Sequence, residues 1–393
     1  MAEVAQHGRL PWLPVPHRVA LMFASMFFIT GTATPFLPVW LEARGLAADE
    51  IGWLSFAALV VRGVTTPIVG WYADRQHAHR ALIIALSALG LLAWLMLWGA
   101  SGLGWAFAAM ALIALGNTMQ PLVESVALAG VRRAGHDYGR MRTWGSAAFV
   151  VANLLSGWLA NRAGVEPVIS LIALGAAATL AASVLLPAPD PSDPALTARG
   201  SLTWRSAMAV LGVPLMPALL LAAAALQGSH GMYYAYGSLH WKALGLDPAW
   251  FGALFAVGLI TEIALFWWSA RALAWLGAPG LLIAGGALAV LRWSWMAYDP
   301  PLVVLLPLQV LHGLTFGCAH LGAMQLLLKI VPPEKSATAQ GLYALVSTAG
   351  VALATAMSAR LYPVAGGTAY GAMAVMAAIG LLVAIKIARA ARA

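Results

Sequence analysis

Charged residues are scarce in this chain of 393 residues, and their scarcity excludes a soluble domain of ordinary composition. Only 9% of the residues are charged and 62% are hydrophobic, whereas soluble domains carry about 25% charged residues. Residues 81–123 contain no Asp, Glu, Lys or Arg. A membrane-spanning helix needs about 20 apolar residues, so this stretch can cross a bilayer twice, with a turn near residues 101–104. The chain is therefore predicted to lie in a membrane.

Cysteine is almost absent, which limits the redox and metal chemistry open to the chain. The one cysteine is Cys318, inside an apolar run, so neither an intrachain disulfide nor a paired-cysteine metal site can form. We expect no metal and no cofactor. The sequence also has no His-Glu-x-x-His, no glycine-rich phosphate loop ending in Lys-Ser/Thr and no Gly-x-Ser-x-Gly. An enzyme is therefore not expected.

Basic residues outnumber acidic ones by 22 to 14, which gives a formal net charge of +8. They stand singly or in pairs between apolar runs, and this spacing argues against binding to nucleic acid. If the chain crosses the membrane twelve times, sixteen Lys and Arg fall on one face and four on the other. The positive-inside rule then predicts a multi-pass protein of the plasma (inner) membrane with both termini in the cytoplasm.

The apolar runs are predicted to be helices, because backbone polar groups in hydrocarbon must form hydrogen bonds within the protein. The expected fold is an all-α membrane protein with twelve transmembrane helices in two six-helix bundles. A proline-rich break at residues 187–194 divides the chain into an N-terminal bundle (1–187), a cytoplasmic linker (188–208) and a C-terminal bundle (209–393). The first run is too long for a signal-peptide core and is interpreted as a retained helix. The helices are expected at about residues 19–40, 51–72, 81–100, 103–130, 140–162, 167–187, 209–240, 249–271, 279–298, 301–328, 337–361 and 367–388.

Polar and ionisable residues inside these helices are the candidate functional residues, because such groups are costly in a bilayer unless they face a polar interior. Asn117, Gln120 and Glu124 lie at i, i+3 and i+7 on one face of the helix expected over 103–130. Arg142 opens a matching polar stripe in the next helix, although its long side chain could also reach the cytoplasmic surface.

The second half of the chain repeats this pattern with Glu262 and Arg292 on different helices. We expect each buried Glu to pair with a buried Arg, either as a switch that opens to hold a substrate or as a permanent salt bridge. Two stripes of polar and aromatic residues accompany the charges. They are Gln227, His230, Tyr234 and Ser238 in one helix, and Gln309, His312, Phe316 and His320 in another.

The segment Gly70-Trp-Tyr-Ala-Asp74-Arg75 resembles the loop motif between the second and third helices of the major facilitator superfamily. The resemblance implies that Gly70, Asp74 and Arg75 belong to a cytoplasmic gate, in which Asp74 caps a helix and pairs across the gate. Residues 77–79 depart from the pattern: histidine stands where glycine is usual, and Ala-His stands where a basic pair is usual.

Other segments resemble the oligosaccharide–proton symporter branch of that superfamily, typified by lactose permease. The residues from Pro35 to Leu41 match the end of its first helix, and Glu124 and Arg142 match its Glu-to-Arg spacing. The match continues through Glu262, Arg292 and His312. It implies that Glu124 and Arg142 bind substrate, that Glu262 couples the proton to the substrate, and that His312 helps to hold the substrate.

One departure from this branch concerns the proton. Three residues after His312, the branch places a second, proton-carrying carboxylate, and this chain has Thr315. Lactose is therefore not expected as the substrate. Segments 239–246, 258–262 and 311–320 resemble the phenylpropionate permease subgroup, which implies small aromatic carboxylates. Arg142 or Arg292 could bind the carboxylate. Aromatic residues at 233, 234, 236 and 241 could stack on a ring, or they could anchor the helix at the membrane interface.

These patterns predict a secondary active transporter that takes up an aromatic carboxylate together with protons by alternating access. Its expected partners are the small-molecule substrate, protons and the lipid bilayer, and it is expected to be a monomer. The alternatives are a sugar or nucleoside proton symporter, a drug-efflux antiporter and a signalling receptor or scaffold with the shape of a transporter. The expected substrate-binding residues are Glu124, Arg142, Gln120, Asn117, Tyr234 and His312, and the expected proton-coupling residues are Glu262, Arg292 and His312.

Overall fold

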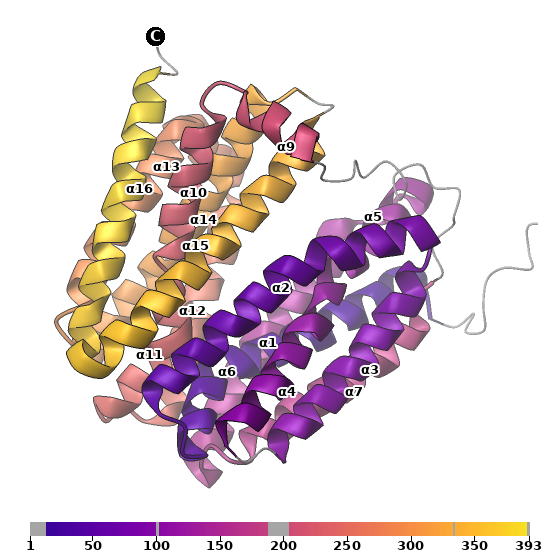
Figure 1. Ribbon diagram of the computed structural model, residues 1–393, viewed down its shortest axis with the longest axis vertical. Coiled ribbons are helices and arrows are strands. Elements are labelled where there is room, and N and C mark those ends of the chain that lie inside the picture. Colours follow the sequence, from indigo (N-terminus) through magenta and orange to yellow (C-terminus); the bar gives the residue numbers. More distant parts are fainter. Residues whose placement is uncertain (1–12, 100–101, 188–203, 333–334, 391–393) are drawn as a thin grey trace, which may run out of the picture.

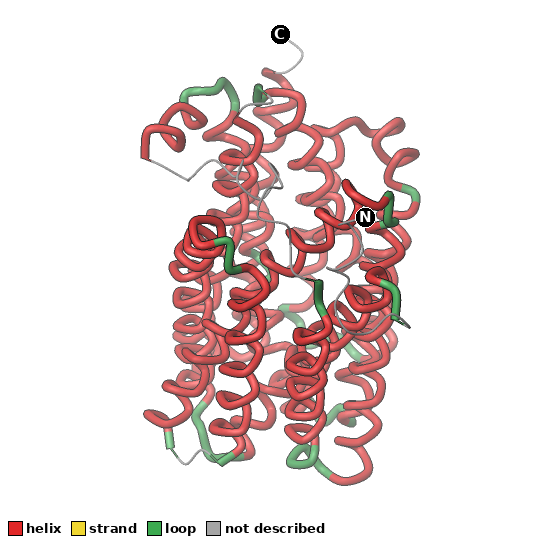
Figure 2. Tube along the Cα trace, turned by 90° about the vertical axis from the view of Figure 1, so that its right-hand side faces the viewer, coloured by secondary structure: helices red, strands yellow, loops and turns green. Residues whose placement is uncertain are grey.

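The computed structural model describes residues 13–99, 102–187, 204–332 and 335–390, and within these ranges it contains helices and no β-strand. Figures 1 and 2 show the helices packed side by side along one direction. The helices before residue 188 are α1 (Val15–Ala43), α2 (Ala48–Gln76), α3 (His79–Trp98), α4 (Leu103–Gly116), η1 (Asn117–Met119), α5 (Gln120–Ala134), α6 (Tyr138–Ala163) and α7 (Val168–Leu185). The helices after residue 203 are α9 (Trp204–Leu211), α10 (Met216–Gly228), α11 (Gly231–Ala243), α12 (Pro248–Trp267), α13 (Ser269–Met296), α14 (Leu302–Ile330), α15 (Ser336–Ala365), η3 (Gly366–Ala369) and α16 (Tyr370–Ala390).

By length and composition, nine helices in the described ranges could cross a membrane, or ten if a bent pair counts as one span. Two features explain the difference from the twelve predicted. Residues 336–390 count as a single stretch, although they hold two long helices, α15 and α16, joined by η3. The 26-residue α6 is not counted among these spans; its central part contains no charged residue but includes Asn153 and several Gly and Ser residues. If the bent pair is counted as one span, α15 and α16 are counted separately and α6 is added, the twelve expected helices are present.

The helix expected over 209–240 is wrong at its start. Residues 205–211 in α9 are bent by 93° from the following helical segment, residues 216–243. Pro214 cannot donate a backbone hydrogen bond, and Leu215 adopts a left-handed φ of 67°. The chain therefore turns sharply between α9 and α10. The predicted linker boundary at residue 208 falls inside α9, and residues 188–203 lie outside the described ranges. The domain boundaries therefore stay a prediction.

Helices α1–α7 pack on one another as one group, called the N group, and α10–α16 pack as a second, called the C group (Figure 1). In the N group, α1 packs against α6 and α7, and α3 packs against α4 and α7. In the C group, α13 packs against α14 and α16, and α10 packs against α15. The two groups meet where α6 packs on α12, α2 on α15 and α1 on α11.

The two groups share a hydrophobic core toward one end of the molecule, called the closed end below. This core joins buried Phe36 and Trp40 of α1 to buried Trp241 of α11 and Phe251 of α12. Toward the opposite end, called the open end, each group has a separate core. In Figure 1 the groups diverge toward this end, where α5 and α9 lie. The burial pattern thus defines a conformation that is closed at one end and open at the other.

Glycines allow the helices of the two groups to approach closely near the closed end. Gly52 of α2 lies against Ala359 of α15, and Gly252 of α12 lies against the backbone of Asn153 in α6. A β-carbon at either glycine would overlap atoms of the partner helix. These two contacts therefore depend on the absence of a side chain.

Polar contacts also join the two groups at the closed end. Lys242 Nζ lies 2.6 Å from Glu42 Oε2, which links the ends of α11 and α1. The Tyr236 hydroxyl donates a hydrogen bond to the carbonyl of Ala48 at the start of α2, at 2.8 Å. The closed end is therefore held by a charge pair and a hydrogen bond as well as by apolar packing.

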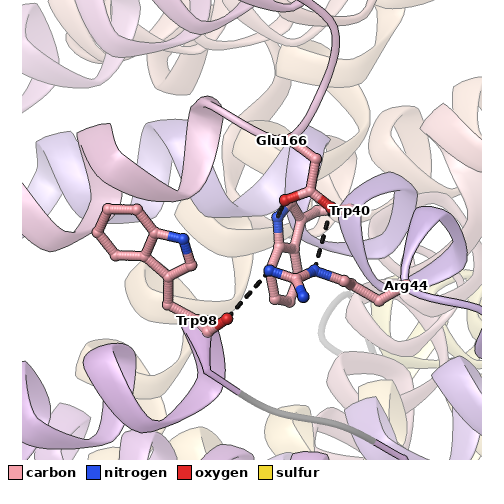
Figure 3. Close-up of polar contacts among 4 residues, drawn as sticks. All are labelled: Trp40, Arg44, Trp98 and Glu166. Carbon is pink, nitrogen blue, oxygen red and sulfur yellow. Dashed lines mark hydrogen bonds and ion pairs between the residues drawn. The ribbon is translucent and has the colours of Figure 1, made fainter.

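Within the N group, Arg44 braces the closed end (Figure 3). Its Nε lies 3.0 Å from Glu166 Oε1, and its Nη2 donates to the carbonyl of Trp98 at 3.0 Å. Trp40 Nε1 donates to the other Glu166 oxygen at 3.2 Å. This cluster connects the ends of α1 and α3 to the segment between α6 and α7.

Candidate functional site

Arg142 lies in the first turns of α6, where its guanidinium packs on aromatic rings of α1. The guanidinium carbon is 3.9 Å from the ring centroid of Phe27 and 5.6 Å from that of Phe23. Gly145 makes room for this arrangement, since a β-carbon there would lie 3.1 Å from Arg142 Nη1. An aromatic face attracts a cation, so Arg142 is held among the helices and does not extend to the surface.

Glu262 of α12 interacts with Arg142 of the opposite group. Arg142 acts on Glu262 electrostatically at longer range, since no ion pair within 4.0 Å joins Glu262 to any described residue, Arg142 included. The backbone nitrogen of Glu262 lies against Gly313 of α14, the residue that follows His312. The backbone of Glu262 therefore packs on α14 next to His312, and its side chain interacts at long range with a cation of the N group.

Arg292 of α13 does not form the expected pair with Glu262. The Arg292 side chain is fully buried, at 0% exposure, and its donors are taken by neutral groups. Nε donates to the carbonyl of Leu308 at 2.9 Å, Nη2 donates to Gln309 Oε1 at 2.8 Å, and Nη1 lies 3.1 Å from His312 Nδ1. Two aromatic rings cover the guanidinium as well. Because these contacts occupy its donors, Arg292 orients His312 in this conformation.

Thr315 of α14 stands where the symporter pattern has a second carboxylate, and it joins two histidine residues. Its Oγ1 lies 3.0 Å from His230 Nε2 and donates to the carbonyl of His312 at 2.9 Å. The other ring nitrogen of His230 lies 3.1 Å from the carbonyl of Leu226. Thr315 therefore belongs to a hydrogen-bond network with two histidines, and its hydroxyl, unlike a carboxylate, cannot carry a net charge.

Tyr234 lies one turn beyond the break between α10 and α11 and is half-buried. Its ring stacks on the ring of His230, with centroids 6.2 Å apart and an interplanar angle of 25°. The other aromatic residues expected to line a site here, Tyr233, Tyr236 and Trp241, are fully buried. They pack in the core shared by the two groups, so they neither anchor the membrane interface nor present an open ring-stacking surface.

Gln120 and Glu124 of α5 meet Arg62 of α2. Arg62 Nη2 donates to Gln120 Oε1 at 3.0 Å, and Arg62 and Glu124 interact electrostatically. The expected ion pair between Glu124 and Arg142 is not formed in this structure. Tyr138 lies within the electrostatic reach of both. In this conformation, Arg62 is the cation that hydrogen-bonds to the polar face of α5.

Asn117 lies where the α4–α5 helix tightens into the 3₁₀ turn η1. Pro121 has no N–H to donate to the Asn117 carbonyl, and the N–H of Gln120 bonds to that carbonyl instead. The Asn117 side chain is exposed, whereas Gln120 and Glu124 are half-buried. The polar face predicted for this helix thus includes a local change of helix type.

The residues of the gate motif lie at the open end. Asp74 Oδ1 is 3.0 Å from His79 Nε2, and Arg75 is exposed. Gly70 has no atom within 4 Å of an added β-carbon. His77 adopts a left-handed φ of 51°, a conformation that the usual glycine would adopt with less strain. Among the described residues, no ion pair joins this motif to the C group.

Two residues of this region had little or no signal in the sequence. Arg62 is the only charged residue between positions 51 and 73. This isolation in an apolar run could have identified it as a candidate site residue. Phe27 lies within an apolar run, so no pattern distinguishes it from a core residue. Its contact with Arg142 depends on how α1 and α6 pack.

The sequence matches the model of the MFS_1-like family over residues 18–371. It is 29% identical over 368 residues to the "probable 3-phenylpropionic acid transporter" of Escherichia coli (strain K12), covering 91% of this chain and 94% of that protein. It is 28% identical over 330 residues to the maltose permease of Geobacillus stearothermophilus, covering 83% and 82%.

The solved structure of the nucleoside transporter NupG resembles this fold with a TM-score of 0.77 at 17% identity, covering 95% of this chain and 98% of that one. A likeness at this identity concerns the fold alone. The family match extends over most of the chain, and the helical architecture agrees with it. The chain therefore belongs to the MFS_1-like family of the major facilitator superfamily, as a multi-pass membrane protein that transports a small molecule and is not an enzyme.

Proposed function

We propose that this chain is a proton-coupled symporter of the inner membrane that takes up a small aromatic carboxylate, such as 3-phenylpropionate. The similarity to a probable 3-phenylpropionic acid transporter supports this substrate class. The excess of Lys and Arg on one face supports a cytoplasmic position for both termini. The open end then faces the cytoplasm, the described conformation is inward-open, and a monomer is sufficient for the transport cycle.

The excess of arginines over carboxylates at the site is the observation that carries this proposal. Three arginines, Arg62, Arg142 and Arg292, stand against two carboxylates, Glu124 and Glu262, in this part of the described structure. Ionic groups away from water favour neutralisation by an opposite charge. With Glu262 ionised, one excess positive charge remains, and protonation of Glu262 adds a second; the site therefore suits a substrate that carries a negative charge.

Glu262 is the residue that we propose carries the proton. It is the only acidic residue within the helices α10–α16, and Thr315 cannot replace a carboxylate. The cation that acts on Glu262 is Arg142, which belongs to the N group. Protonation of Glu262 would weaken an attraction between the two groups, and this links the proton to their relative movement.

Transport by purified protein in vesicles tests this proposal. Uptake of 3-phenylpropionate should rise when a pH gradient, acid outside, is imposed on wild-type protein. Glu262→Gln should abolish this response, because the amide cannot take up a proton, whereas Asp247→Asn, at an exposed residue, should retain it. Unchanged uptake by Glu262→Gln, with no effect of the gradient on either protein, would show that the coupling is wrong.

A sugar or nucleoside is the second candidate substrate. The polar side chains of Asn117, Gln120 and Glu124 suit hydroxyl-rich ligands, and a maltose permease is among the similar proteins. Competition binding with 3-phenylpropionate, maltose and uridine on purified protein separates the candidates. Displacement by maltose or uridine alone would favour the second candidate. Drug efflux predicts transport in the opposite direction, which the same vesicles detect.

A further inference from the structure

Arg62 lies halfway along the 29-residue α2 and has an unusual set of contacts for a membrane arginine. The one hydrogen bond of its guanidinium in the described structure runs from Nη2 to Gln120 Oε1, at 3.0 Å. No carboxylate of a described residue lies within 4.0 Å of it. Glu124, one turn after Gln120, acts on Arg62 only at longer range.

The guanidinium of Arg62 keeps an accessible edge. Its other nitrogens have no hydrogen-bond partner among the described residues, and each keeps some accessible surface. A guanidinium has five N–H donors in a planar fork, so one bond to Gln120 fixes its orientation and leaves the remaining donors available. A fork held in this way matches the two oxygens of a carboxylate.

The two other arginines of the site each have aromatic rings over the guanidinium. Arg292 is fully buried and bonded to three neutral groups. Arg142 has its face on Phe27 and acts on Glu262. Among these three arginines of the described structure, Arg62 is therefore the one whose guanidinium has no aromatic ring over it and whose orientation is fixed by a hydrogen bond to a neutral amide.

The position of Arg62 is also suited to a substrate between the two groups. The next residue, Gly63, faces Thr348 of α15, with 3.9 Å between an added β-carbon and Thr348 Cγ2. Arg62 thus lies in the part of α2 that packs along the C group, near the middle of the span. A ligand bound there could contact both groups.

We propose that Arg62, oriented by Gln120, binds the carboxylate of the substrate. This inference rests on the proposed function, because it requires an anionic substrate. Arg142 keeps its electrostatic interaction with Glu262, the proposed proton carrier. The arginine that binds the substrate anion therefore differs from the arginine that interacts with the proton carrier. Glu124 lies close enough to repel the bound carboxylate, and its negative charge then limits the affinity.

Binding to the purified full-length protein tests the assignment with two probes, 3-phenylpropionate and the neutral 3-phenylpropionamide. Arg62→Gln should raise the Kd of 3-phenylpropionate about 10- to 100-fold and leave that of the amide within about threefold. Arg62→Lys keeps the charge without the fork, so its loss should be smaller. Arg162→Gln, at an exposed residue of α6, removes the same charge elsewhere and should bind both probes as the wild type does.

A second variant should change the Kd of 3-phenylpropionate in the opposite direction. It tests the assignment even if Arg62→Gln does not fold. Glu124→Gln should lower the Kd of 3-phenylpropionate, because it removes the repelling charge. A raised Kd would overturn the inference, as would unchanged binding by Arg62→Gln; both outcomes leave the substrate class intact. If wild-type protein binds maltose or uridine and no carboxylate, the proposed function and this inference are both overturned.

Discussion

Gly252 of α12 faces the backbone carbonyl of Asn153 in α6 so closely that a β-carbon cannot fit between them. The contact joins the N and C groups toward the closed end. Alternating access requires the groups to separate at this end during part of the cycle. The glycine therefore stabilises the conformation described here relative to one that is open at the other end.

A larger residue at position 252 should shift the conformational equilibrium. We expect Gly252→Val to separate α12 from α6 and to populate a conformation in which the closed end has opened. Spin labels at Ala43→Cys and Leu244→Cys, both at exposed positions at this end, should then report a longer distance. Gly371→Ala, where nothing lies within 4 Å of the new β-carbon, is the matched control. An unchanged distance in Gly252→Val would contradict this account.

The ion pair between Glu42 and Lys242 should make a smaller contribution to the same equilibrium. Their side chains are 41% and 46% exposed, and an ion pair exposed to this extent is worth about 0.2–1 kcal/mol. Lys242→Gln should therefore increase the population of the conformation in which this end has opened, but only several-fold. Added salt should reduce the effect. The exchanged pair Glu42→Lys with Lys242→Glu should restore the wild-type population. If the exchange fails to restore it, the charge pair is not the cause.

The fold was predictable from the sequence because lipid leaves few alternatives. Long apolar runs must be helices, and the twelve expected helices match the structure in position except at two places. Between residues 268 and 278, α13 begins at Ser269 and not near residue 279; near residue 212, the chain bends. That bend depends on Pro214 and on the left-handed Leu215. A run of apolar residues on both sides of the proline concealed it.

The candidate residues were predictable, but their partners were not. Isolated charges in apolar runs identified Glu124, Arg142, Glu262 and Arg292, and the expectation of simple Glu–Arg pairs followed from the cost of burial. The structure satisfies Arg292 with neutral groups instead. Which acceptors reach a guanidinium depends on how the helices rotate and pack, and a single sequence does not record this.

A double-mutant cycle should show that Glu262 and Arg292 are energetically independent. Arg292→Gln should lower the free energy of unfolding by about 1–3 kcal/mol for each buried neutral group that it leaves without a hydrogen-bond partner. Glu262→Gln should have a much smaller effect, and the double variant should equal the sum of the two to within about 0.5 kcal/mol. Denaturant unfolding of purified protein measures all three. A coupling well above that limit would show that the two residues pair after all.

Thr315→Val should separate the structural role of the hydroxyl from a role in proton transfer. Valine keeps the shape of threonine but leaves His230 Nε2 without its partner, so we expect a loss of about 1–3 kcal/mol in the free energy of unfolding. Thr315→Ser retains the hydroxyl and should lose less. Since a neutral hydroxyl cannot hold the transported proton, uptake by Thr315→Val should still respond to a pH gradient. A variant that binds 3-phenylpropionate normally but no longer responds to the gradient would place Thr315 on the proton path and remove Glu262 as its sole carrier.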